Sequence, residues 1–196
     1  YRINLLQCRP LQIRSIEEAA STKPPPGVAH LLDARGAVIG PGRVIHPDRL
    51  IYVVQSRYGA LNLHDRLEVA RLIGAINRAS TGSKLLLLGP GRWGTRDPWL
   101  GLPVSFSEIN NVAALCEIVA MNENLVPDVS LGTHFLNELI EADMLYFALF
   151  PDRAGNCLDE NRILGWPNRL SELVGGAEKF EQLVRVVDLP HGTTLY

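Results

Sequence analysis

Residues 89–98 form a polar stretch, Gly-Pro-Gly-Arg-Trp-Gly-Thr-Arg-Asp-Pro, that holds the residue types best suited to bind a ligand. Its glycines have no side chain, so backbone amides can approach a bound molecule closely. Arg92 and Arg96 can each grip a phosphate or a carboxylate with paired N–H donors. Asp97 can hold a metal ion or orient an arginine. We therefore expect a binding site for a small anionic ligand in this stretch.

The tryptophans of this region offer a second kind of contact, because Trp93 or Trp99 can stack on a base or on a guanidinium. The stretch is not a Walker A loop, since no Gly-Lys-Ser/Thr follows, and it lacks the Gly-x-Gly-x-x-Gly pattern between a strand and a helix. A competing interpretation is a rigid loop in which Arg92 pairs with a buried acid and Trp93 fills the core. The candidate ligand-binding residues of the stretch are Gly89, Gly91, Arg92, Trp93, Arg96 and Asp97.

Two further candidates lie in the segments that follow. Glu117 interrupts an otherwise apolar strand, and a charge in that place is costly unless it is paired, so Arg92 or Arg96 is its expected partner. Thr133 and His134 open a helix whose N-terminus could receive an anion. The simpler interpretation of each site is structural: a buried ion pair at Glu117 and a helix cap at Thr133.

The spacing of apolar residues predicts the elements that position these side chains. It indicates a helix over 62–79, for which Asn62 is a suitable N-cap. The inward face of that helix is expected to hold Leu63, Leu67, Ala70, Ile73 and Ile76. Strands are expected at 50–54, 85–88, 103–106, 113–120, 144–150 and 183–187, and further helices at 133–142 and 168–174. The predicted fold class is mixed α/β: a mixed β-sheet flanked by helices, with the core order α-β-β-β-α-β after a β-rich N-terminal part.

Length and composition indicate a globular domain and exclude several classes of protein. The chain has 196 residues, of which 46% are hydrophobic and 20% are charged, so wholesale disorder, a collagen-like repeat and a disulfide scaffold are excluded. The net charge of −2 lacks the basic excess of a dedicated nucleic-acid binder, so no nucleic-acid partner is expected. Scattered cysteines, and no apolar run long enough to span a bilayer, predict a cytoplasmic protein without a membrane partner.

The first residues resemble a known family. Leu5-Leu-Gln-Cys-Arg-Pro10 is similar to the strand that closes the ATP-grasp nucleotide-binding domain of phosphoenolpyruvate synthase and pyruvate phosphate dikinase, which carries a Leu-Gln-x-Arg-Pro signature. The resemblance places Gln7 and Arg9 at a nucleotide site, near the metal ion and the phosphates. It divides the chain into a terminal strand of that domain at 1–14, a proline-rich linker at 15–27 and an accessory C-terminal α/β domain at 28–196.

A second resemblance covers most of the chain from about 31 to 187. Residues 88–104 and 130–135 look like a C-terminal domain of larger bacterial proteins related to the synthase and the dikinase. The resemblance implies a parent protein that is an ATP-dependent phosphotransferase using Mg²⁺ and ATP. The rest of that parent chain, including its ATP-grasp domain, is then the first expected partner.

Several parts of the family pattern are missing from this sequence. The remaining clamps of the nucleotide site, the phosphohistidine domain and the pyruvate-binding barrel have no counterpart here. Gln7 and Arg9 therefore belong to an incomplete site, and the chain alone is expected to be inactive in phosphoryl transfer. The chain begins with Tyr1 rather than Met, which agrees with a piece of a longer protein.

Two alternatives to an accessory anion-binding or regulatory domain stay open. One is a docking or dimerisation module for the parent enzyme, including a possible homodimer, which apolar strands and an ordinary surface charge allow. The other is a metal-dependent nuclease, whose core shares the predicted element order and would use Asp97 and Glu117 as metal ligands. Val119 stands where the nuclease pattern has a lysine, and the net charge of −2 also disfavours it.

Overall fold

The computed structural model describes residues 27–35, 37–39, 44–119, 129–130 and 133–196 of the chain. Residues 1–26, which hold Gln7, Arg9, the predicted terminal strand and nearly all of the predicted linker, lie outside this part. Within the described residues, no helix has both the length and the apolar character needed to cross a membrane.

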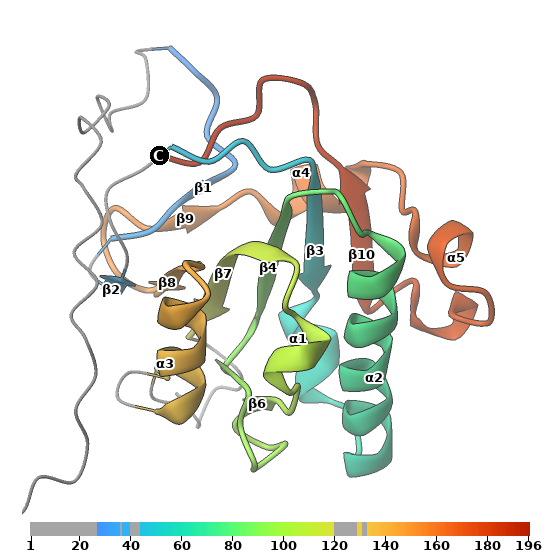
Figure 1. The fold of residues 1–196 in the computed structure, drawn as a ribbon. Helices are drawn as coiled ribbons and strands as arrows, with labels where there is room; N and C mark the ends of the chain where they lie inside the picture. The colour runs from blue at the N-terminus through green and yellow to red at the C-terminus, as the bar shows by residue number, and fades with distance from the viewer. Residues whose placement is uncertain (1–26, 36, 40–43, 120–128, 131–132) are drawn as a thin grey trace, which may run out of the picture.

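The centre of the domain is a six-stranded mixed sheet (Figure 1). Its inner strands run parallel to one another, and each outer strand runs antiparallel to its neighbour. From edge to edge the strands are β10 (Val184–Asp188), β3 (Arg49–Val53), β4 (Leu85–Pro90), β7 (Val112–Ile118), β8 (Leu145–Leu149) and β2 (Ala37–Ile39). The predicted fold class, a mixed sheet flanked by helices, is confirmed.

The inner strands are buried along almost their whole length. Every residue of β4 and of β8 is buried, and β7 is buried except at Ala113. This explains why their sequences are apolar without alternation, because a parallel strand has protein on both faces. Glu117 of β7 is the charged residue that shares this environment.

The helices that connect the inner strands lie on one face of the sheet. They are α1 (Gln55–Gly59), α2 (Leu63–Ala79), the 3₁₀ helix η1 (Phe106–Glu108) and α3 (His134–Glu141). The inner strands follow one another across the sheet in chain order, and right-handed crossovers then place these connecting helices on the same side. Figure 1 shows α2 and α3 in front of this face. The core between helices and sheet includes Ile73, Leu87, Trp93, Leu115 and Leu139.

The opposite face is covered by segments from both ends of the described chain. Helix α4 (Glu160–Gly165) and the antiparallel ribbon of β1 (Leu32–Asp33) and β9 (Cys157–Leu158) lie over it. Ile163 of α4 packs there with Leu88 and Phe147. The tail continues through α5 (Leu170–Leu173) and η2 (Glu178–Phe180) to β10.

Within the described residues, the outer edge of β10 pairs with no further strand and is covered by hydrogen bonds from Asn168 and Arg169. The Asn168 amide accepts a hydrogen bond from the backbone N–H of Val186 at 2.8 Å and donates one to the carbonyl of Val184 at 3.0 Å. The N–H of Arg169 donates to the carbonyl of Val186 at 2.7 Å. These bonds occupy backbone groups that a neighbouring strand would use.

Helix α2 begins as predicted, because the Asn62 side chain accepts a hydrogen bond from the backbone N–H of Asp65. Its inward face differs from the prediction in the first turn. Leu63 is 47% exposed, whereas Arg66 is 1% exposed and takes the buried position. Further along the helix, Ile73 is buried as predicted.

The strand predicted at 103–106 is wrong. The chain instead forms β6 (Gly101–Leu102), which pairs in parallel with β5 (Arg92–Trp93) in a separate two-stranded sheet. A capping box between Ser105 and Glu108 then starts η1, so the apolar residues here serve a helical turn. The short elements α1, α4 and β9 were not predicted, and the helix expected at 168–174 is the shorter α5.

Candidate functional site

The 89–98 stretch lies beyond the carboxyl end of β4, where open α/β sheets often bind their ligands. It is more regular than the predicted loop, since its first two residues complete β4 and Arg92–Trp93 form β5. Gly91 and Gly94 flank β5 with φ angles of 65° and 70°, a conformation that glycine adopts without steric cost. The glycines are therefore explained by the fold of the stretch itself.

Trp93 is a core residue. Its side chain is 1% exposed, and its indole N–H donates to the carbonyl of Cys116 at 3.2 Å. The ring packs so closely on Gly89 that a Cβ added there would lie 2.6 Å from a ring carbon. The structure supports the interpretation in which Trp93 fills the core, and its burial leaves no ring face for a ligand.

Glu117 receives its hydrogen bonds from neutral donors. Its Oε1 accepts from the backbone N–H of Trp93 at 3.0 Å and from the hydroxyl of Ser130 at 2.5 Å. Its Oε2 accepts from the N–H of Ser130 at 2.9 Å and from the hydroxyl of Tyr146 at 2.6 Å. The expected ion pair with an arginine is wrong, because these donors fill both oxygens. One carboxylate thus joins β7, β8, β5 and the segment before α3.

Burial raises the pKa of Glu117 above its ordinary value of 4.5, and the hydrogen bonds from Ser130, Tyr146 and Trp93 offset this effect only in part. The folded protein therefore holds the proton more tightly than the unfolded chain does. The stability that this proton contributes is fully present below the unfolded pKa and is lost as the pH rises through the raised pKa.

The raised pKa of Glu117 predicts a pH-dependent stability. From about pH 4.5 towards neutrality, we expect the free energy of unfolding of the wild type to fall relative to that of Glu117→Gln. Glutamine does not titrate, so the difference between the two proteins isolates this carboxyl group. Urea unfolding at a series of pH values measures it. A difference that stays constant over the series would contradict the prediction.

Gly94 allows the 89–98 stretch to pack closely against α3. A Cβ added at Gly94 would overlap the ring of Phe135. We expect Gly94→Ala to lower the free energy of unfolding by about 1–3 kcal/mol more than Gly82→Ala, because only the former must also displace a core ring. Gly82 has a φ of 90° and open space around an added Cβ, so it is a matched control for the backbone cost. Thermal unfolding compares the two, and equal losses would refute the close packing.

Helix α3 starts with an ordinary cap. The hydroxyl of Thr133 accepts from the N–H of Leu136 at 3.2 Å and donates to the carbonyl of Ser130 at 2.8 Å. His134, the first residue of the helix, is exposed. Thr133 therefore has a structural task, and His134 lies at the surface next to the segment that Glu117 fixes.

The tip of the stretch is a tight turn. The Thr95 hydroxyl donates to the carbonyl of Asp97 and accepts from the Asp97 N–H, both at 3.1 Å. The Asp97 carboxylate accepts from the N–H of Trp99 at 3.0 Å. Arg96 and Asp97 are exposed, and Arg92 is half-buried. Of the predicted ligand-binding residues in this stretch, Arg96 is thus the cation at the surface.

Arg66 of α2, which was not predicted as a site residue, anchors this turn to the domain. Its guanidinium lies between two aromatic rings, 4.7 Å from the centroids of Tyr58 and of Trp99. It donates at 2.9–3.1 Å to three backbone carbonyls, those of Gly59, Leu61 and Pro98. The sequence feature that could have identified Arg66 is the position of an arginine on the apolar face of the predicted helix.

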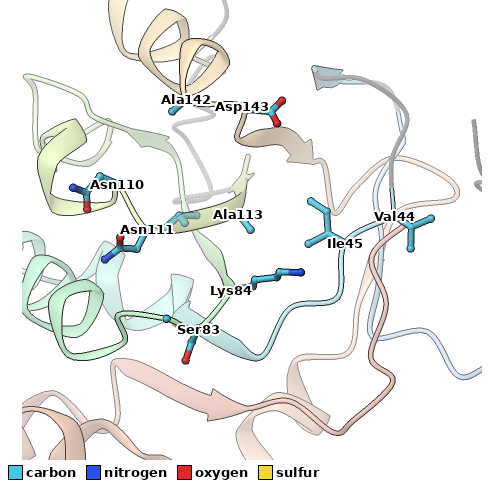
Figure 2. Close-up of a pocket in the computed structure, with 11 residues that line it drawn as sticks. Val44, Ile45, Ser83, Lys84, Asn110, Asn111, Ala113, Ala142 and Asp143 are labelled. Carbon is cyan, nitrogen blue, oxygen red and sulfur yellow. The ribbon is translucent and has the colours of Figure 1, made fainter. Parts of the chain in front are cut away.

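Two hollows lie at the other end of the inner strands. The one in Figure 2 encloses about 440 Å³, and the side chain of Lys84 extends across it towards Ile45. Asn110 and Asn111, which also line it, hydrogen-bond to Asn77. The second hollow encloses about 570 Å³ and is lined by residues around His46, Asp188 and His191. Neither contains a predicted site residue.

The geometry does not favour the nuclease alternative. Glu117 is buried with both oxygens occupied, whereas Asp97 lies in an exposed turn. In the part of the chain that the structure describes, no group of three His, Cys, Asp or Glu side chains is placed to hold a metal ion.

The comparisons with known proteins identified no relative of this chain. No protein-family model, curated protein or solved structure matches the chain. The resemblance to the synthase and dikinase family therefore stays an expectation, and the function is argued from the residues themselves.

Proposed function

We propose that this chain is the C-terminal part of a phosphoenolpyruvate-synthase-like, ATP-dependent phosphotransferase, and that its α/β domain is an accessory module that binds a small anionic ligand. The observation that carries the ligand site is the fixed turn that presents Arg96 beyond the carboxyl end of β4. Mg²⁺ and ATP belong to the nucleotide domain of the parent, to which Gln7 and Arg9 would contribute.

The rigidity of the turn supports a binding role. Glu117 accepts from the N–H of Trp93, Phe135 packs on Gly94, and the Arg66 guanidinium donates to a carbonyl of the turn. A loop that is already ordered loses little conformational entropy when a ligand binds. Functional side chains are often carried in this way, on a loop that a rigid scaffold positions.

The local charge also supports an anionic ligand. Within the described structure, the Arg66 guanidinium contacts carbonyls and rings and no carboxylate, so no ion pair neutralises it. Arg96 adds a second positive charge at the surface. Asp97 adds one negative charge to the same turn, so the three side chains together carry a net charge of +1.

Arg96→Ala tests the proposal directly. A hydrogen bond to a charged group contributes about 1.5–3 kcal/mol, so we expect this variant to weaken ligand binding by about tenfold or more. The melting temperature should not change, because the side chain is exposed. Calorimetric titration with ATP, ADP, phosphoenolpyruvate and pyruvate, with and without Mg²⁺, measures the affinity. Arg71→Ala, an exposed arginine of α2, is the control.

The outcomes of this titration separate the proposals. Binding that Arg96→Ala abolishes and Arg71→Ala preserves identifies the ligand class and supports the site. Binding that neither variant changes places the ligand elsewhere. If none of the four compounds binds, the anion-binding proposal fails and a docking role becomes the better explanation.

Exposed apolar side chains favour a docking or dimerisation role. The large apolar residues that are at least 40% exposed are Val28, Leu63, Trp99, Ile140, Leu164 and Tyr196. They are spread along the described chain, from the residues before β1 to its last residue, and belong to no single element. Light scattering on a concentrated solution tests homodimerisation, and a strict monomer would remove that possibility.

A further inference from the structure

We propose that the anionic ligand of this site is a nucleotide, with its base stacked on the outer face of Trp99 and its phosphates on Arg96. This inference rests on the proposed function, because it assigns a ligand class to the same turn. It adds a second binding element, an aromatic platform, to the arginine.

Trp99 is built into the fold as a fixed surface and is not a loose surface side chain. One face of its indole lies on the Arg66 guanidinium, 4.7 Å from the ring centroid, and the whole side chain is 51% exposed. Its backbone N–H is held by Asp97, and the carbonyl of the preceding residue, Pro98, accepts from Arg66. The stack therefore runs from Tyr58 through Arg66 to Trp99, and Trp99 is half-exposed at the surface.

The charge behind the indole selects the kind of molecule that stacks in front of it. Arg66 is 1% exposed and has no carboxylate partner in the described structure, so its field reaches the ring. A cation on one face draws π-electron density towards itself, so the outer face is less attractive to a second cation. An electron-rich planar ring that carries negative groups fits best, and a nucleotide base with its phosphates has this combination.

The neighbouring side chains match the other parts of a nucleotide. Arg96 is exposed three residues before Trp99 and offers paired donors to phosphate oxygens. Asp97, between them, is a carboxylate of the type that accepts hydrogen bonds from ribose hydroxyls. Phosphate, sugar and base thus each have a suitable side chain.

The experiment compares ATP with inorganic tripolyphosphate, both without Mg²⁺, by calorimetric titration of the whole chain. Base stacking on an aromatic side chain predicts that ATP binds about tenfold more tightly than tripolyphosphate. Trp99→Leu should remove this preference and leave the affinity for tripolyphosphate unchanged, whereas Trp99→Phe should keep most of it. Arg96→Ala should weaken both ligands.

Two controls protect the interpretation. Trp166→Phe changes a half-buried tryptophan that also lies near an arginine, 5.5 Å from Arg162, and should leave both affinities unchanged. A circular-dichroism melt of each variant shows whether it is folded, and Trp99→Phe keeps the test decisive if Trp99→Leu is unfolded.

The possible failures are distinguishable. If tripolyphosphate binds as tightly as ATP, or if Trp99→Leu weakens both ligands equally, the base platform is refuted while the anion site stands. If neither compound binds, the proposed function fails and this inference fails with it.

Discussion

Glu117→Ala is expected to unfold the domain or to lower its free energy of unfolding by about 3–5 kcal/mol. The carboxylate satisfies two backbone N–H groups, of Trp93 and Ser130, and the hydroxyls of Ser130 and Tyr146. Each buried donor that loses its acceptor costs about 1–3 kcal/mol, and the amides cannot turn to find another. A domain of this size has a total stability of about 5–15 kcal/mol, so the loss is a large part of it.

Milder variants and a surface control test whether the loss of stability comes from the hydrogen bonds of Glu117. Tyr146→Phe removes one of the donors and should cost about 1 kcal/mol. Glu138→Ala removes an exposed carboxylate on α3 and should change stability by less than about 0.5 kcal/mol. Urea unfolding ranks the variants. A Glu117→Ala protein as stable as Glu138→Ala would show that the hydrogen-bond network around Glu117 does not support the fold.

Arg66→Ala is expected to lower the free energy of unfolding by a similar amount, about 3–5 kcal/mol, for a different reason. The substitution leaves the carbonyls of Gly59, Leu61 and Pro98 without their donor and opens a space between two rings. The turn at 95–98 should loosen along with α2, so the fluorescence of the half-exposed Trp99 should shift as well.

Arg66→Lys separates geometry from charge. A lysine keeps the positive charge but has no planar fork to reach three carbonyls while lying flat between two rings, so its stability should fall between those of wild type and alanine. Arg71→Ala on the same helix should stay within about 0.5 kcal/mol of wild type, because Arg71 is exposed. If Arg66→Lys were as stable as wild type, charge alone would explain the burial of Arg66.

The long elements could be predicted from the sequence because their patterns reflect burial directly. The inner strands are apolar throughout, and α2 repeats its apolar residues at helical spacing after a good cap. The region around 103–106 was mispredicted because a short apolar run fits a strand and a helical turn equally well. There the capping box of Ser105 and Glu108 decided the outcome.

The site was predicted in part, and its errors share one cause. The burial of Glu117 follows from the strand around it, but its donors are separated from it by 13 to 29 residues, a pairing that no local pattern encodes. Arginine was the obvious partner by charge, while neutral backbone and hydroxyl donors satisfy the carboxylate instead. The same limitation hid the stack of Tyr58, Arg66 and Trp99, whose members come from α1, α2 and the turn after β5.

The way Asn168 borders β10 has a consequence for how this protein behaves at high concentration. A free sheet edge is a template on which a second chain can extend the sheet, and it is a common starting point for domain swapping and fibril growth. Here the Asn168 amide occupies the N–H of Val186 and the carbonyl of Val184, and the backbone N–H of Arg169 occupies the carbonyl of Val186. Two of these three bonds depend on one neutral side chain, whose deamidation to aspartate would replace a donor with an acceptor and reopen the carbonyl of Val184.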